Sequence, residues 1–235
     1  MNDMNRKRVL IVYFSFSSQT KKLLQGLSSG LGENDIDVEW QQLNTVTNLQ
    51  FPLDSYSAAL KLMLTAFFRK RISIKELQPN CFTPWDLIVI AGPSWSLHPS
   101  GPILSLLDRD GTRLFRNQKV LPLISCRGFW RMHYWELRLL LKRKGAKVLS
   151  PLVFMHPQTE PWRTIGVCLK MAGKMPGSKT SWFYHCYPEY GHSHQQVNDA
   201  KAIGNILGKY IQEKRDLKNI CFSIPVKISD SLFQR

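Results

Sequence analysis

The sequence predicts an α/β fold in which helices cover both faces of a mainly parallel sheet. Short apolar runs of β-forming residues alternate with segments of helical hydrophobic spacing over about 150 residues. Most of these runs are continuous rather than alternating, as expected for strands that are covered on both faces. With 43% hydrophobic residues in 235, the chain has enough apolar side chains to fill a substantial core.

Five segments read as strands. The first, residues 9–14, is an uninterrupted apolar run and is expected at the centre of the sheet. Residues 36–40 alternate apolar and polar positions, which favours a place nearer the sheet edge. Gly92 and Pro93 are expected to end the third strand. The remaining predicted strands are residues 87–91, 120–125 and 147–155.

Five segments have helical spacing of apolar residues. In the first, Leu23, Leu24, Leu27 and Leu31 repeat on one face. Basic residues follow two of the others, where they complement the negative end of a helix dipole. The predicted helices are residues 20–31, 58–68, 102–107, 134–141 and 197–211.

Two segments exceed a minimal five-stranded unit. We expect one domain over residues 1–215, with an insertion or lid at 156–194, because this aromatic-rich stretch is longer than ordinary connections. Residues 216–235 are expected to form a C-terminal arm. Within it, the alternation at 220–228 predicts a strand that Pro225 restricts to an edge.

Charge and cysteine content exclude several classes. The net charge of +15 predicts an anionic partner, which could be a phosphorylated cofactor, nucleic acid, a membrane surface or an acidic protein such as a carrier protein. Because the basic residues are spread along the chain, nucleic acid is not the expected partner. Five scattered cysteines without a C-x-x-C pair give neither a disulfide framework nor a zinc ribbon. Without a long apolar run, we expect no integral membrane span and a cytoplasmic location. The sequence leaves a homodimer possible.

The turn after the first strand is a candidate anion site. It contains Ser15, Ser17, Ser18, Gln19 and Thr20 at the start of a helix, where backbone N–H groups and the helix dipole favour a phosphate. It lacks the lysine and glycines of a nucleotide triphosphatase loop and the G-x-G-x-x-G of a dinucleotide turn. The alternative is a serine-rich helix cap without a ligand.

The turn after the third strand holds Pro93, Ser94, Trp95 and Ser96. An indole between small polar residues offers a flat face on which a planar ring can stack, and nearby prolines stiffen the loop. The alternative is that Trp95 packs against a neighbouring helix.

The turn after the fourth strand holds Cys126, Arg127, Gly128, Phe129 and Trp130. Gly128 permits close backbone approach to a ligand, and the aromatic residues can wall one side. A nucleophilic role for Cys126 is disfavoured, since free cysteines are usually small buried apolar residues. No catalytic residue is assigned.

A cluster of histidines and one cysteine near the C-terminal part of the chain raises the possibility of a metal site. His185 and Cys186, with His192 and His194, match no zinc-ligand spacing, and aromatic residues between them suggest a packed loop. We therefore expect no metal site.

In these turns the chain resembles the flavodoxin superfamily, whose phosphate turn has the general form T/S-x-T-G-x-T. Ser15, Ser17 and Thr20 match in kind, and Ser18 stands where glycine is usual. The resemblance implies a three-layer sandwich with a five-stranded parallel sheet of order 2-1-3-4-5, and FMN as cofactor. It also places the turns 93–98 and 126–131 against the isoalloxazine ring, where Arg127 would stabilise negative charge.

A narrower resemblance concerns the pattern of prolines, Trp95 and Trp130 in these loops. It is similar to the dialkylresorcinol-condensing enzymes, in the NAD(P)H-dependent oxidoreductase branch of the superfamily. The leading hypothesis is therefore an FMN-dependent oxidoreductase that moves hydride or electrons between flavin and NAD(P)H or a small aromatic or cyclic substrate. The alternatives are an electron-transfer flavodoxin and a cofactor-free binding protein on the same fold.

Overall fold

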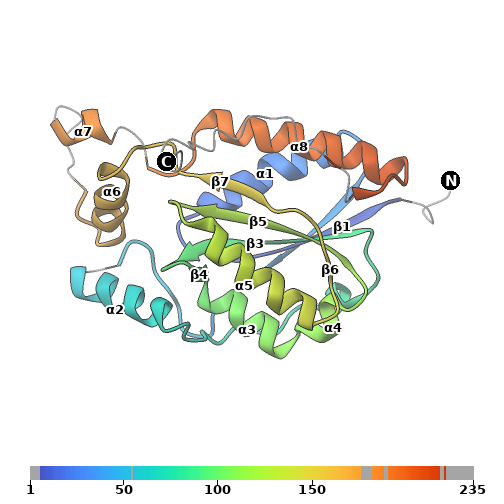
Figure 1. Ribbon diagram of the computed structural model, residues 1–235, viewed down its shortest axis with the longest axis horizontal. Coiled ribbons are helices and arrows are strands. Elements are labelled where there is room, and N and C mark those ends of the chain that lie inside the picture. The colour runs from blue at the N-terminus through green and yellow to red at the C-terminus, as the bar shows by residue number, and fades with distance from the viewer. Residues whose placement is uncertain (1–5, 54, 176–181, 188–189, 218–219, 221–235) are drawn as a thin grey trace, which may run out of the picture.

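The computed structural model describes residues 6–53, 55–175, 182–187, 190–217 and 220. Its centre is a parallel sheet in the order β2-β1-β3-β5-β6, which confirms the predicted strand order 2-1-3-4-5 (Figure 1). The main strands are β1 (Arg8–Tyr13), β2 (Asp37–Gln42), β3 (Leu87–Trp95) and β5 (Lys119–Cys126). The fifth predicted strand divides into β6 (Lys147–Val148) and β7 (Leu152–Met155), which both pair with β5.

The prediction that Gly92 and Pro93 end the third strand is wrong. β3 continues through both residues to Trp95 and folds back on β4 (His98–Pro99) as an antiparallel pair. Pairing with β1 stops at Ala91, whereas pairing with β5 reaches Pro93. From Gly92 onward the side of β3 that faces β1 forms no strand pairing, so no backbone N–H is needed there and a proline is tolerated.

Helices cover both faces of the sheet, as predicted. One face carries α1 (Gln19–Gly32) and α8 (His194–Gln212), and the other carries α3 (Gly101–Arg109), α4 (Gly111–Phe115) and α5 (Trp130–Arg143) (Figure 1). Alternate residues of β1 enter the two cores, since Val9, Ile11 and Tyr13 belong to one and the residues between them to the other.

The remaining helices are α2 (Tyr56–Phe67), the short 3₁₀ helix η2 (Pro79–Phe82), α6 (Trp162–Met171) and α7 (Trp182–Cys186). The last two belong to the predicted insertion at 156–194, and α6 lies beside α2 with α7 beyond it at the same end of the molecule (Figure 1). None of the helices in the described ranges combines the length and the apolar character that crossing a bilayer requires. The strand predicted at 220–228 lies outside the described residues except for Ile220.

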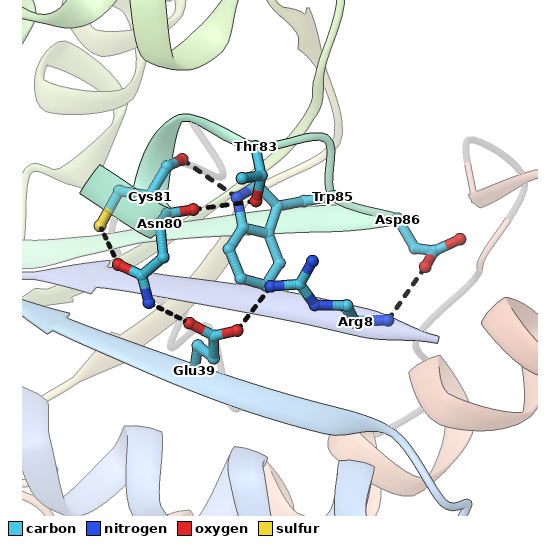
Figure 2. A network of polar contacts seen from close by, with 7 residues as sticks. All are labelled: Arg8, Glu39, Asn80, Cys81, Thr83, Trp85 and Asp86. Atoms are coloured by element: carbon cyan, nitrogen blue, oxygen red, sulfur yellow. Dashed lines mark hydrogen bonds and ion pairs between the residues drawn. The ribbon is translucent and has the colours of Figure 1, made fainter. Parts of the chain in front are cut away.

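A polar network fixes the amino-terminal edge of the sheet (Figure 2). The Arg8 guanidinium lies 4.2 Å from the centre of the Trp85 ring and pairs with Glu39 at 2.6 Å. The backbone N–H of Arg8 donates to Asp86 at 2.9 Å, and Asn80 donates to Glu39. This network ties the segment before β3 to β1 and β2, at the edge of the sheet opposite the three loops of interest.

Helices α1 and α8 approach closely through glycines. A Cβ atom on Gly30 would overlap the backbone carbonyl oxygen of Lys201, and one on Gly204 would overlap that of Leu27. Gly32, at the end of α1, has open space instead. The short distance between the helices therefore depends on the missing side chains at Gly30 and Gly204.

We predict that Gly30→Ala destabilises the protein by about 1–3 kcal/mol, because α8 must move away to accommodate the methyl group. The control Gly32→Ala, in the same helix, is expected to be neutral or stabilising by up to about 1 kcal/mol, since alanine is the better helix former. Urea unfolding followed by circular dichroism measures both. Equal effects of the two substitutions would contradict the close approach of the helices.

Candidate functional site

A pocket opens where the carboxyl ends of β1, β3 and β5 meet, and it encloses about 810 Å³ including the part open to solvent. Helices α2 and α6 wall it on the side away from the sheet. All three predicted turns contribute to it, as expected at the carboxyl edge of a parallel sheet. The predicted residues that line it are Ser17, Gln19, Thr20, Pro93, Ser94, Trp95, Ser96, Cys126 and Arg127.

The first turn has the backbone geometry of an anion-binding turn. Ser18 adopts a left-handed conformation (φ 61°) immediately before α1, the region that glycine enters most easily. Ser18 thus occupies the position of the usual glycine without preventing the turn. In the described part of the chain, no hydrogen bond uses the backbone N–H groups of Ser17, Gln19 or Thr20. Ser15 lies outside the pocket lining, and its Oγ accepts from the Lys21 N–H at 3.3 Å.

A second segment holds this turn from outside. The Tyr190 hydroxyl lies 3.0 Å from Ser17 Oγ, and the backbone N–H of His192 donates to Gln19 Oε1 at 3.0 Å. Between them, Gly191 has φ 94°, and a Cβ atom there would overlap the Gln19 side chain. The side-chain oxygen of Gln19, predicted as a cofactor contact, is therefore engaged by the protein itself.

Trp95 in the second turn packs against other aromatic side chains and also lines the pocket. Its ring meets Phe14 edge-on at 5.5 Å and Phe16 at 5.6 Å between centroids. Phe51 contacts Phe16 and stacks on Tyr190, so that an aromatic wall runs along the pocket. Ser96 Oγ donates to the Met63 carbonyl oxygen at 3.0 Å, which fixes the hairpin against α2.

The third turn enters the pocket only in part. Cys126 and Arg127 line it, and the Arg127 guanidinium donates to Thr164 on α6 at 3.3 Å. Gly128, Phe129 and Trp130 do not line it. Helix α5 starts at Trp130, four residues earlier than predicted, and its early start directs Phe129 to solvent with 78% exposure.

Burial raises the pKa of the Cys126 thiol to about 12, so that this residue is a neutral thiol at physiological pH. A thiolate nucleophile is therefore disfavoured here, in agreement with the sequence.

Sequence reasoning missed a hydrogen-bonded chain behind the pocket. Ser125 Oγ lies 2.7 Å from His192 Nε2, and His192 Nδ1 lies 3.1 Å from Gln196 Oε1. Gln196 uses the opposite end of its amide, Nε2, to donate to the Met155 carbonyl oxygen at 2.7 Å. Its Oε1 must then accept, so His192 carries its proton on Nδ1 and accepts the Ser125 hydroxyl proton at Nε2. Ser125 consequently presents lone pairs to the pocket.

His156 is a pocket residue that the sequence did not single out. It lines the pocket with 8% exposure, and its ring lies perpendicular to that of His192 with centroids 4.8 Å apart. Its Nδ1 has no hydrogen-bond partner among the residues that the structure describes. Burial lowers the pKa of His156 to about 3 and that of His192 to about 4. Both imidazoles are therefore neutral at physiological pH.

The remaining lining residues come from the helices and are mostly apolar. They are Leu62, Met63 and Ala66 of α2, and Val167, Cys168 and Met171 of α6. In the sequence, these two helices were indicated only by the helical spacing of apolar residues at 58–68 and by the unusual length of the segment 156–194. Among the described residues, no group of histidine, cysteine and carboxylate side chains could hold a metal ion.

A scan against protein-family models found no match, and neither did a sequence search of curated proteins. Solved structures do match the fold. A flavodoxin from the domain Archaea covers 87% of this chain and 99% of its own, with TM-score 0.52 and 11% identity. A flavodiiron protein from Giardia intestinalis covers 90% of this chain and 38% of its own, with TM-score 0.50 and 11% identity.

A flavoprotein in complex with FMN from Lactobacillus acidophilus covers 63% of this chain and 93% of its own, with TM-score 0.48 and 23% identity. The alignments with the archaeal flavodoxin and the flavodiiron protein establish a flavodoxin-like fold for this chain, as the sequence predicted. At these identities they establish the fold alone.

The buried imidazoles predict acid sensitivity. The folded pKa values of His156 and His192 lie below the ordinary value of 6.5, so the unfolded chain binds protons first as the pH falls. We expect the free energy of unfolding to decrease from pH 6.5 to about 4, by about 1.4 kcal/mol per pH unit for each histidine. His156→Gln should reduce this slope. Tyr190→Phe removes a hydrogen bond but no group that titrates in this range, and should leave the slope unchanged.

Chemical denaturation at several pH values measures both slopes. An unchanged slope in His156→Gln would show that His156 is not held neutral by burial.

Proposed function

We propose that this flavodoxin-like chain is an FMN-dependent oxidoreductase. The observation that carries the proposal is the first turn, where backbone N–H groups without a hydrogen-bond partner among the described residues lie at the start of a 14-residue helix and border an aromatic-walled pocket. An anion there would satisfy orphan donors and be stabilised by the helix dipole. When bound, FMN would supply hydride or electron transfer at its ring.

The phosphate would be held by the turn after β1. Ser17 and Thr20 line the pocket and offer hydroxyl groups beside their backbone N–H groups. Ser18 supplies the left-handed backbone, and the Tyr190 contact with Ser17 keeps the turn in place. With its side-chain oxygen engaged by His192, Gln19 would contribute its backbone N–H only.

The ring would be held by the aromatic wall around Trp95 together with Cys126 and Arg127. A cavity with apolar walls and few polar groups is typical of cofactor sites. Arg127 would stabilise the negative charge that develops on reduction. His156, with a buried nitrogen that lacks a partner, is suited to a hydrogen bond with a bound group.

The reaction partner would be NAD(P)H or a small aromatic or cyclic substrate, in keeping with the resemblance to dialkylresorcinol-condensing enzymes. Helix α6, within the segment 156–194, would act as a lid that excludes water, because Val167, Cys168 and Met171 present apolar side chains to the pocket. The basic surface would attract NADPH or an acidic carrier protein.

A visible absorption spectrum separates this proposal from its alternatives. A yellow protein that consumes NADPH supports the enzyme. Bound FMN without turnover assigns the chain to the electron-transfer carriers, and a colourless protein that cannot be reconstituted assigns it to cofactor-free binding proteins.

Thr20→Val is predicted to weaken FMN binding by about 10-fold to 100-fold, because it removes a hydroxyl that would bond a charged group while keeping the volume. Cys126→Ala, at the opposite side of the pocket, should change the dissociation constant less than about threefold, since a neutral buried thiol is a weak donor. Quenching of FMN fluorescence by the apoprotein gives both constants. Equal losses in the two variants would count against the phosphate assignment.

Arg127→Gln is predicted to lower the midpoint potential of bound flavin. Loss of a positive charge at the pocket costs the reduced form about 1 kcal/mol, which is roughly 20 mV for a two-electron couple. Arg131 lies on α5 against Trp130 and outside the pocket lining, so the control Arg131→Gln should leave the potential unchanged. Spectroelectrochemical titration measures the shift, and an unaltered potential in Arg127→Gln would remove this residue from the ring environment.

A further inference from the structure

Helix α2 has two apolar faces, and among the described residues the inner face lines the pocket while the outer face is largely exposed. Its inner residues Met63 and Ala66 line the pocket. Its outer face carries large side chains with exposed fractions from 50% to 75%, where a helix of a monomeric protein is usually polar. These residues are Tyr56, Leu60, Leu64, Phe67 and Phe68. Their spacing places them on one side of the helix.

Other exposed apolar side chains lie on neighbouring elements at the same end of the molecule. Leu97 is in the hairpin between β3 and β4, Phe129 and Met132 are at the start of α5, and Trp182 is on α7. Figure 1 shows α2, α6 and α7 together at this end, beyond the carboxyl ends of the strands. Exposed apolar side chains thus gather on elements at the end of the molecule where the pocket lies.

The same face is basic. Residues 56–71 contain Lys61, Arg69, Lys70 and Arg71 and no acidic residue. Arg69 pairs with Glu136 and Arg71 with Asp108. Lys61 and Lys70 border a shallow groove on the outer side of α2 together with Leu60, Leu64 and Phe68, and neither lysine forms an ion pair with any described residue.

We propose that this face docks on a membrane surface that contains anionic lipids. Exposed leucine and phenylalanine side chains beside unpaired lysines are the combination that enters the headgroup region, where the apolar groups insert and the cations meet lipid phosphates. A second copy of the chain is a poorer occupant, because a symmetric contact through α2 would bring the lysines of both copies together. The net charge of +15 adds to the attraction.

Docking in this way would hold the pocket close to the membrane surface, since the inner face of α2 lines the pocket and its outer face would meet the lipid. An apolar ring compound dissolved in the bilayer would then be concentrated near the pocket. This consequence rests on the proposed function, whereas the docking surface itself does not.

Co-sedimentation of the full chain with vesicles tests the proposal. We expect at least fivefold more protein on phosphatidylcholine vesicles with about one third phosphatidylglycerol than on phosphatidylcholine alone. The double variant Leu64→Ser/Phe68→Ser should lose at least tenfold in partitioning, and Lys61→Gln and Lys70→Gln about fivefold each. Leu139→Ser, an exposed apolar position further along α5, serves as the control and should bind like the wild type. Circular dichroism verifies that each variant is folded.

Equal binding to both vesicle types, or wild-type binding by the double variant, would overturn the proposal. If light scattering shows a dimer for the wild type and a monomer for the double variant, the face would instead be assigned to contact with a second copy of the chain. Because the assay needs no flavin, failure to bind FMN would overturn the proposed function and leave this result standing.

Discussion

The left-handed backbone at Ser18 is the constraint on which the site depends. It lets the chain leave β1 and start α1 while the N–H groups of Ser17, Gln19 and Thr20 have no hydrogen-bond partner in the part of the chain that the structure describes. Tyr190 and His192, which lie just before α8, hold this turn through Ser17 and Gln19. Because α8 packs on α1 through glycines, the packing of two helices positions the contacts that keep the turn open.

The buried polar groups at the pocket include two neutral imidazoles, those of His156 and His192, although the protein as a whole is strongly basic. Ser125, His192 and Gln196 form a hydrogen-bonded chain whose directions are all fixed by the Gln196 amide. His156 and Cys126 are neutral because they are buried. Arg127 is thus the cationic side chain among the residues that line the pocket, and it is placed to act on charge that develops there.

The sequence was sufficient for the strands and for the three turns, because continuous apolar runs and turn residues are local signals. The strand order followed from the resemblance to the flavodoxin superfamily. It was insufficient where distant segments meet. The contacts of Gln19 with His192 and of Ser17 with Tyr190 join residues 173 positions apart, and no local pattern reports them. The early start of α5 at Trp130 moved Phe129 and Trp130 out of the predicted site, since helix boundaries depend on packing as well as composition.

In the proposed site, the N–H groups of the first turn bind the phosphate of FMN. A comparison of FMN with riboflavin, which has the same ring and no phosphate, isolates the contribution of these groups. Calorimetric titration of the apoprotein with both compounds should give an FMN affinity at least about 100-fold higher, as expected for several charge-assisted hydrogen bonds. Equal affinities for the two flavins would contradict the account.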